Sequence, residues 1–180
     1  MAHILHCVSS SAAIHKACDL ASKLTQAGHQ VRAVLTPRAA KLVSPQLFEA
    51  LTGERALADE FSAERRGGMD HIELASWAEL CVAAPASADL VSRLALGLAD
   101  DLPATVCLAL PRKVPRLICP AMNPHMLESP PLKRNLARLV EDGWQVIEPG
   151  AGHLACGVQG QGRMAEPAEI QARIGASLRP

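Results

Sequence analysis

The residues best suited to chemistry lie near the C-terminal end, in a glycine-rich loop that carries one cysteine. Residues Gly150–Pro167 read GAGHLACGVQGQGRMAEP and hold five of the chain's 12 glycines. Glycine has no side chain and adopts backbone angles that other residues avoid, so main chain can approach a ligand closely there. An ordinary thiol, with a pKa of about 8.5, would keep the proton of Cys156 at neutral pH. The pattern fits a clamp over a small molecule, and equally a plain surface loop with an incidental cysteine.

Two further segments combine polar side chains with a restricted backbone. Pro120–Met126 reads PAMNPHM, and Asn123 lies in it next to Pro124 in a bent, rigid stretch. This pattern also fits an ordinary turn asparagine. His71–Leu74 reads HIEL, and an imidazole with an unperturbed pKa of about 6.5 can act as a base at neutral pH. If this segment is extended, Glu73 lies on the same side as His71.

Together these segments resemble the flavin-dependent cysteine decarboxylases. The sequence ACGVQGQGRM, residues Ala155–Met164, is similar to the family's substrate clamp, and HIEL is similar to its H-I-x-L segment. The positions that match the family's P-x-M-N-x-x-M-W motif are Pro120, Met122, Asn123 and Met126. The three segments occur in the family's order, and the resemblance covers nearly the whole chain.

The resemblance implies roles for individual residues. His71 would act as the base and Cys156 as a proton donor, while Asn123 would hold the substrate carboxylate with its amide. The other positions implied to bind substrate are Met126, Leu154 and Ala155. Arg163 is either a contact for phosphate or carboxylate or a solvated surface arginine.

The cofactor implied by the resemblance is FMN, bound by turns that follow strands. Backbone N–H groups at a helix N-terminus favour a phosphate, although serines there also serve as simple helix caps. The positions implied to bind the cofactor are Ser10, Ser11, Ala12, Thr36, Arg38, Ser87, Ala88, Asp89 and Ala121. Three positions depart from the family pattern: Ser10 replaces a glycine, Asp89 an asparagine and Leu127 a tryptophan. Asp89 either brings a negative charge near the flavin or caps the helix at Leu90.

The implied reaction is decarboxylation of 4′-phosphopantothenoylcysteine to 4′-phosphopantetheine in coenzyme A biosynthesis. Oxidation to a thioaldehyde would allow carbon dioxide to leave, and the resulting enethiol would then be reduced with a proton from Cys156. An alternative is oxidative decarboxylation of a peptide's C-terminal cysteine, which stops at the enethiol and does not need that thiol. A third possibility is a non-catalytic regulatory binding protein, disfavoured because His71, Asn123 and Cys156 are all present and no acidic tail is visible.

Composition limits the other classes of function. The chain has 180 residues, is 49% hydrophobic and 20% charged, and carries no net charge, which gives no electrostatic case for nucleic acid or a membrane surface as partner. The six cysteines show no C-x-x-C spacing, and the histidines show no metal-ligand spacing, so we expect small core residues in a reducing, cytoplasmic compartment and no metal. The N-terminus lacks the basic region of a signal peptide. The resemblance further implies a homotrimer or a multiple of trimers.

The elements that must position these residues alternate between short apolar runs and helical patterns. We expect an α/β fold: a single three-layer, doubly wound parallel sheet, Rossmann-like or flavodoxin-like, with residues 1–180 as one flavoprotein domain. In such sheets ligands bind at the carboxyl ends of the strands. The expected strands are Ile4–Val8, Val31–Leu35, Leu80–Ala84, Leu117–Cys119 and Gln145–Ile147. The expected helices are Ala13–Ala27, Pro45–Leu51, Leu90–Leu98, Leu132–Val140 and Pro167–Ser177.

Overall fold

The core of the molecule is a five-stranded parallel sheet. The computed structural model describes residues 1–59, 69–153, 157 and 159–179. The strands lie in the order β2-β1-β3-β4-β5, and their pairings are all parallel. Their bounds are β1 His3–Val8, β2 Gln30–Leu35, β3 Leu80–Ala86, β4 Arg116–Pro120 and β5 Trp144–Val146. This topology confirms the predicted doubly wound α/β fold.

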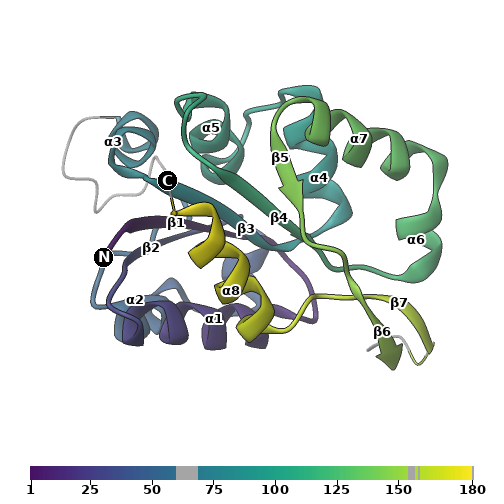
Figure 1. Ribbon diagram of the computed structural model, residues 1–180, viewed down its shortest axis with the longest axis horizontal. Coiled ribbons are helices and arrows are strands. Elements are labelled where there is room, and N and C mark those ends of the chain that lie inside the picture. The colour runs from purple at the N-terminus through teal and green to yellow at the C-terminus, as the bar shows by residue number, and fades with distance from the viewer. Residues whose placement is uncertain (60–68, 154–156, 158, 180) are drawn as a thin grey trace.

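Helices cover both faces of the sheet (Figure 1). One face carries α1 (Ile14–Gln26), α2 (Pro45–Thr52) and α8 (Pro167–Ser177), with the short 3-10 helix Ala39–Lys41 before α2. The opposite face carries α3 (Asp70–Trp77), α4 (Ala88–Leu96), α5 (Leu102–Ala109) and α7 (Pro130–Glu141). The short helix α6 (Pro124–Glu128) precedes α7 at one end of the molecule. Among the described residues, no helix combines the length and the apolar character that crossing a bilayer requires.

The sequence explains why the central elements form where they do. All seven residues of β3 are buried, as expected for a strand covered by helices on both faces. Helix α1 buries Ala17, Leu20, Ala21 and Leu24, which recur at helical spacing. Gly28 follows this helix with a φ of 86°, a left-handed conformation that glycine adopts at little cost.

Three segments differ from the sequence expectations. His71 lies in helix α3 and not in an extended segment, so Glu73 does not share a strand face with it. Helix α5 was not predicted, because its sequence LPATVCLA is apolar almost throughout and shows no amphipathic period. The glycine-rich loop contains an antiparallel hairpin, formed by β6 (Gly150–His153) and β7 (Gln159–Arg163).

Candidate active site

A cavity of about 420 Å³ opens at the carboxyl end of the sheet. The segments that follow β1, β3 and β4 meet there, because these three strands are neighbours in the sheet. Strand β7 closes one side of the cavity. The lining residues are Ser10, Ser11, Ala12, Ala13, His15, Lys16, Ser87, Ala88, Ala121, Met122, Asn123, Met126, His153, Gly162, Arg163 and Met164. This is the place where open α/β sheets bind ligands.

Ser9 joins the ends of two strands beneath the cavity. Its side chain is buried, and its Oγ donates a hydrogen bond to the Pro85 carbonyl at 2.7 Å. The same Oγ accepts a hydrogen bond from the Ser87 N–H at 2.7 Å. Ser9 therefore fixes the turn after β1 against the turn after β3.

The third strand end is joined in the same way. The Ala121 N–H donates to the Ala86 carbonyl at 3.0 Å, which links the segment after β4 to β3. The Met122 N–H donates to the Gly162 carbonyl at 3.1 Å, which links that segment to the hairpin. Backbone hydrogen bonds thus hold the cavity walls together.

Two helices begin at the cavity wall. Ser11 accepts a hydrogen bond from the Ala13 N–H at 3.2 Å just before α1, whose N-cap residue Ala13 offers no capping side chain. Ser87 caps α4 by accepting from the Leu90 N–H at 3.3 Å. Partial positive charge at these helix N-termini favours an anionic group. The wall therefore suits an anionic group such as the phosphate of FMN.

Asn123 stands at the start of α6. Its Oδ1 accepts a hydrogen bond from the His125 N–H at 2.8 Å, so its side chain is the N-cap of this helix. Gly160 of β7 lies against the next residue: a Cβ there would come within 3.1 Å of Pro124 Cγ. The hairpin thus packs closely on the segment that carries Asn123.

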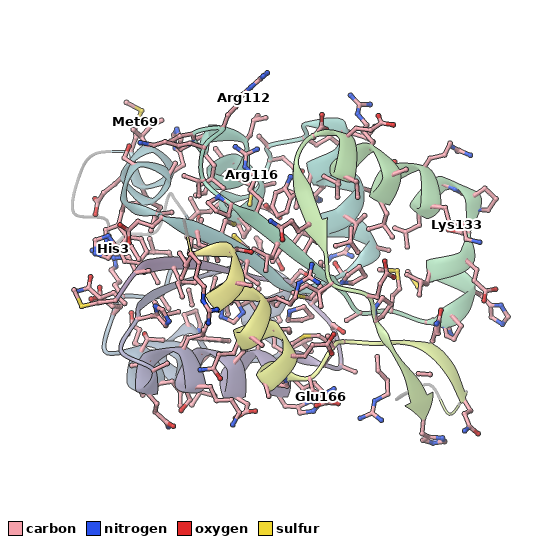
Figure 2. The ribbon with its side chains drawn as sticks, in the orientation of Figure 1. His3, Met69, Arg112, Arg116, Lys133 and Glu166 are labelled. Atoms are coloured by element: carbon pink, nitrogen blue, oxygen red, sulfur yellow. The ribbon has the colours of Figure 1, made fainter. Side chains whose placement is uncertain are left out.

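Basic side chains line the cavity beside the hairpin. Lys16 Nζ donates to the Met164 carbonyl at 2.9 Å and to Glu166 Oε1 at 2.7 Å. Arg163 lies 3.7 Å from the same carboxylate, and the hydrogen bond from Lys16 lowers the pKa of Glu166. Glu166 is labelled just before α8 in Figure 2. Lys16 and Arg163 give this side of the cavity a positive charge that Glu166 offsets only in part.

The structure brings most of the predicted residues together. Of the positions implied for cofactor or substrate, those that line the cavity are Ser10, Ser11, Ala12, Ser87, Ala88, Ala121, Asn123 and Met126. Arg163, for which the sequence left two interpretations open, lines it as well. Leu127, which replaces the family's tryptophan, packs instead against the hydrophobic core.

Three other residues that were predicted to bind the cofactor are not among the described residues that line the cavity. Thr36 is buried and its Oγ1 accepts from the Ala39 N–H at 3.1 Å, while Arg38 is exposed, and neither is among the described residues that line the cavity. Asp89 also lies outside that lining and pairs with Arg93 at 2.9 Å. Ser87, not Asp89, caps α4.

The two predicted catalytic residues are placed differently. His71 is half-buried on α3 and is not among the described lining residues. Cys156 lies outside the described residues, as do Leu154 and Ala155.

Several lining residues were missed from the sequence. Lys16 and His15 carry no motif that would distinguish them from ordinary surface residues, and His153 and Met164 were noted only as part of the glycine-rich loop. Lys16 and Met164 are 148 positions apart, and only tertiary packing brings them into contact. The one available signal was the position of Lys16 in the first turn of the helix after β1.

The fold and this cavity define a class: a doubly wound α/β protein that binds an anionic ligand at the carboxyl end of its sheet. The model of the family described as Flavoprotein matches residues 1–179. The chain belongs to this family.

Individual relatives make the comparison sharper. The chain is 44% identical to the coenzyme A biosynthesis bifunctional protein CoaBC of Bacillus subtilis, over 93% of this chain and 41% of the relative. It thus spans about two-fifths of the length of these bifunctional relatives. It is 37% identical to a probable phosphopantothenoylcysteine decarboxylase of Streptococcus mutans, over 97% of this chain and 98% of the relative.

Solved structures share the fold over nearly the whole chain. A mutant PPC decarboxylase complexed with pantothenoylaminoethenethiol superimposes with a TM-score of 0.87 and 32% identity, covering 97% of each chain. The FMN-dependent cysteine decarboxylase SpaF superimposes with a TM-score of 0.83 and 28% identity, covering 99% of this chain and 95% of SpaF.

Proposed function

We propose that this chain is an FMN-dependent decarboxylase that converts 4′-phosphopantothenoylcysteine to 4′-phosphopantetheine in the cytoplasm. The observation that carries the proposal is the meeting of Asn123 with the N-termini of α1 and α4 in one cavity. The relative from Streptococcus mutans, which has nearly the same length, supports this substrate over others. On this proposal residues 1–180 form one flavoprotein domain.

The donor groups of the cavity fit FMN. Ser10, Ser11 and Ser87 lie at or near the starts of α1 and α4, where hydroxyl and backbone N–H groups suit a phosphate. Ala12, Ala88 and Ala121 are small and leave room for a flat ring system. When bound, FMN supplies reversible two-electron oxidation and reduction.

The protein's own groups then orient the substrate and move protons. The amide of Asn123 would bind the substrate carboxylate. This carboxylate would leave as carbon dioxide once the thiol-bearing carbon, which is next to the carbon that carries the carboxylate, is oxidised. Lys16 and Arg163 also line the cavity and would attract the substrate, which carries a phosphate and a carboxylate. Cys156 would donate a proton to the enethiol.

His71 would reach the cavity from a second copy of the chain. Helix α3 and the β6–β7 hairpin lie at opposite ends of the long axis in Figure 1. A homotrimer, or a multiple of trimers, with the flavin between subunits would place α3 of one subunit beside the cavity of the next. The imidazole would then take the proton of the substrate thiol.

A peptide substrate is the alternative that one observation favours. That observation is Leu127, which departs from the tryptophan of the family motif. Such an enzyme would stop at the enethiol and leave the electrons on its cofactor.

Product masses distinguish the two functions. The purified protein, reconstituted with FMN, is incubated without oxygen with 4′-phosphopantothenoylcysteine and, separately, with a peptide that ends in cysteine. Loss of carbon dioxide alone from the first compound supports the proposal, and loss of carbon dioxide and two hydrogens from the peptide supports the alternative. A protein that binds no FMN and changes neither compound contradicts both.

A further inference from the structure

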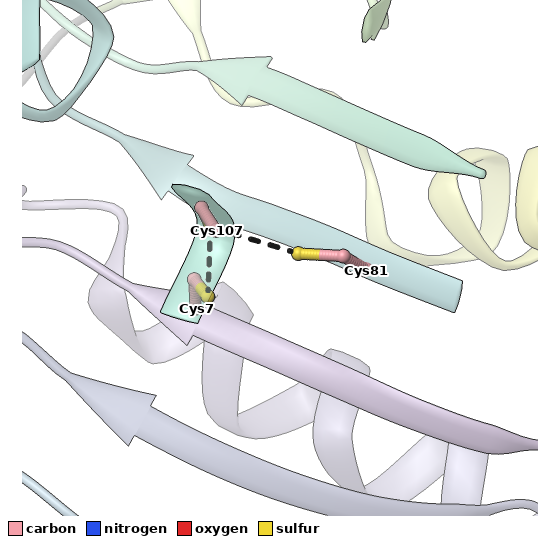
Figure 3. Close-up of side chains that lie close together, drawn as sticks. All are labelled: Cys7, Cys81 and Cys107. Carbon is pink, nitrogen blue, oxygen red and sulfur yellow. Dashed lines mark hydrogen bonds between the residues drawn. The ribbon is translucent and has the colours of Figure 1, made fainter. Parts of the chain in front are cut away.

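Three buried cysteines from distant parts of the sequence meet on one face of the sheet. Cys7 lies on β1, Cys81 on β3 and Cys107 on α5, which packs over these strands (Figure 3). The Sγ atoms of Cys7 and Cys107 are 3.6 Å apart, and those of Cys81 and Cys107 are 3.9 Å apart. All three sulfur atoms lie within 4.8 Å of one another. We call these residues the thiol cluster.

The separations of 3.6 and 3.9 Å are close to those of three sulfur atoms around one metal ion. A metal bonded to three sulfur atoms in a plane at about 2.3 Å holds them about 4.0 Å apart. We propose that Cys7, Cys81 and Cys107 form a three-sulfur binding site for the soft monovalent cation Cu(I). Each thiol that binds as a thiolate releases its proton to solvent, and the cation keeps its oxidation state.

The number and type of ligands favour Cu(I) over Zn(II). Structural zinc sites take four ligands in a tetrahedron. In the part of the chain that the structure describes, the group consists of three thiols, with no histidine or carboxylate in it. Thiolate ligands favour soft cations such as Cu(I).

A hollow gives the cluster a route to the surface. It has a volume of about 700 Å³, and Cys107 and Arg116 both belong to its wall. Arg116 and Trp144 begin β4 and β5, so this hollow lies at the amino end of the sheet, away from the candidate active site. Figure 2 labels Arg116 beside α5. Cys107 is thus the residue of the cluster that borders this hollow, although it is itself buried.

The test is anaerobic titration of the full-length, FMN-loaded protein with Cu(I) supplied as its bicinchoninate complex. X-ray absorption at the copper edge then counts the ligands. We expect one equivalent of Cu(I) with three sulfur neighbours at about 2.3 Å. A wild-type spectrum with two sulfur neighbours, or with nitrogen among the copper ligands, overturns the proposal. Because it is measured on the wild-type protein, this outcome does not depend on whether a variant folds.

Single substitutions assign the site to the cluster. Cys107→Ser removes the thiol that contacts both others, and we expect at least a tenfold loss of Cu(I) affinity and loss of the three-sulfur shell. Cys119→Ser is the matched control, because it removes a buried thiol of the same sheet outside the cluster, and Cys18→Ser removes a partly exposed one. Both controls should bind as the wild type does. An unchanged three-sulfur shell in a folded Cys107→Ser protein, or its loss in Cys119→Ser, overturns the assignment.

Discussion

Helix α3 and the β6–β7 hairpin, which closes one side of the cavity, lie at opposite ends of the molecule (Figure 1), and the cavity and the helix are built in different ways. At the cavity, hydrogen bonds from Ser9, Ala121 and Met122 tie together three strand ends and the hairpin. Helix α3 instead packs by Leu74 and Ala75 on the core below it, and Glu73 pairs with Arg32 at 3.2 Å. The cavity thus gathers most of the residues predicted to bind cofactor or substrate, whereas the predicted base, His71 on α3, is not among its described lining residues. Under the proposed function, catalysis depends on bringing the two regions together between subunits.

Removal of the predicted base should have the largest effect. We expect His71→Asn to retain FMN and to lose turnover by roughly 10²–10⁴-fold, because this is the usual contribution of a general base. Steady-state rates with 4′-phosphopantothenoylcysteine, together with flavin absorbance, measure both properties. Turnover near the wild-type rate would show that His71 is a structural histidine.

Mixing two impaired variants tests whether the two regions form one site, provided that activity is assayed at a substrate concentration well below the KM of Asn123→Asp. His71→Asn has an intact cavity and Asn123→Asp has an intact α3, so a site formed between subunits can combine the two intact halves. Random assembly of equal amounts should restore activity to about a quarter of the sites in a cyclic oligomer. Co-expression with two affinity tags isolates the mixed oligomers, and a lack of recovery in them would contradict a shared site.

The cavity itself is tested at Asn123. Aspartate also caps helices and can accept the hydrogen bond from the His125 N–H, so Asn123→Asp should keep the local fold and the bound FMN. Its charge would face the substrate carboxylate, and we expect the KM to rise by about 10–100-fold through like-charge repulsion. Asn123→Ser, which caps without a charge, is the control and should raise the KM less. Equal KM values for Asn123→Asp and the wild type would remove Asn123 from the carboxylate site.

The hydrogen bonds beneath the cavity should contribute to stability even without a ligand. Ser9→Ala removes the acceptor of the Ser87 N–H and the donor to Pro85 in a buried place, which typically costs about 1–3 kcal/mol. Denaturant unfolding of the apo-protein measures this cost. Ser177→Ala, which removes an exposed hydroxyl, should change stability by less than about 0.5 kcal/mol. A similar loss in both variants would mean that Ser9 does not hold the two strand ends together.

The sheet and its large helices could be predicted because runs of apolar residues indicate buried strands, and apolar residues at helical spacing indicate the buried face of a helix. β3, for example, reads LCVAAPA and is buried throughout. Helix α3 was missed because its apolar residues do not form one face: Leu74 and Ala75 are buried, whereas Ile72 is exposed. The cavity was predicted where motifs follow strand ends, at Ser11, Ser87 and Asn123. Lys16 was not, because its contacts with Met164 and Glu166 depend on how α1 and the segment after β7 pack.

The smallest expected effect is a pH dependence of stability caused by His6, which lies in the sheet that connects the two regions. Its side chain is buried on β1, its ring lies edge-on to Phe48, and its Nε2 lies 2.7 Å from the Ala84 carbonyl, to which it donates when neutral. Desolvation lowers the pKa of His6 from 6.5 to about 4, although the hydrogen bond to Ala84 opposes this shift. Between these values the unfolded chain binds more protons than the folded one, so stability falls as the pH falls from 6.5 toward 4. From about pH 7.5 to about pH 5.5 we expect a loss of about 1 kcal/mol from this residue.

His6→Asn separates this contribution from those of other histidines. The variant starts from a lower stability, but its free energy of unfolding should fall less between the two pH values than that of the wild type. His29, whose pKa is also lowered by desolvation, adds a slope of the same sign that remains in the variant. His125→Asn, at an exposed position, is the matched control and should retain the wild-type slope. Urea unfolding of all three proteins at both pH values gives the slopes. If His6→Asn loses as much stability as the wild type, the buried imidazole is not the group whose protonation destabilises the fold.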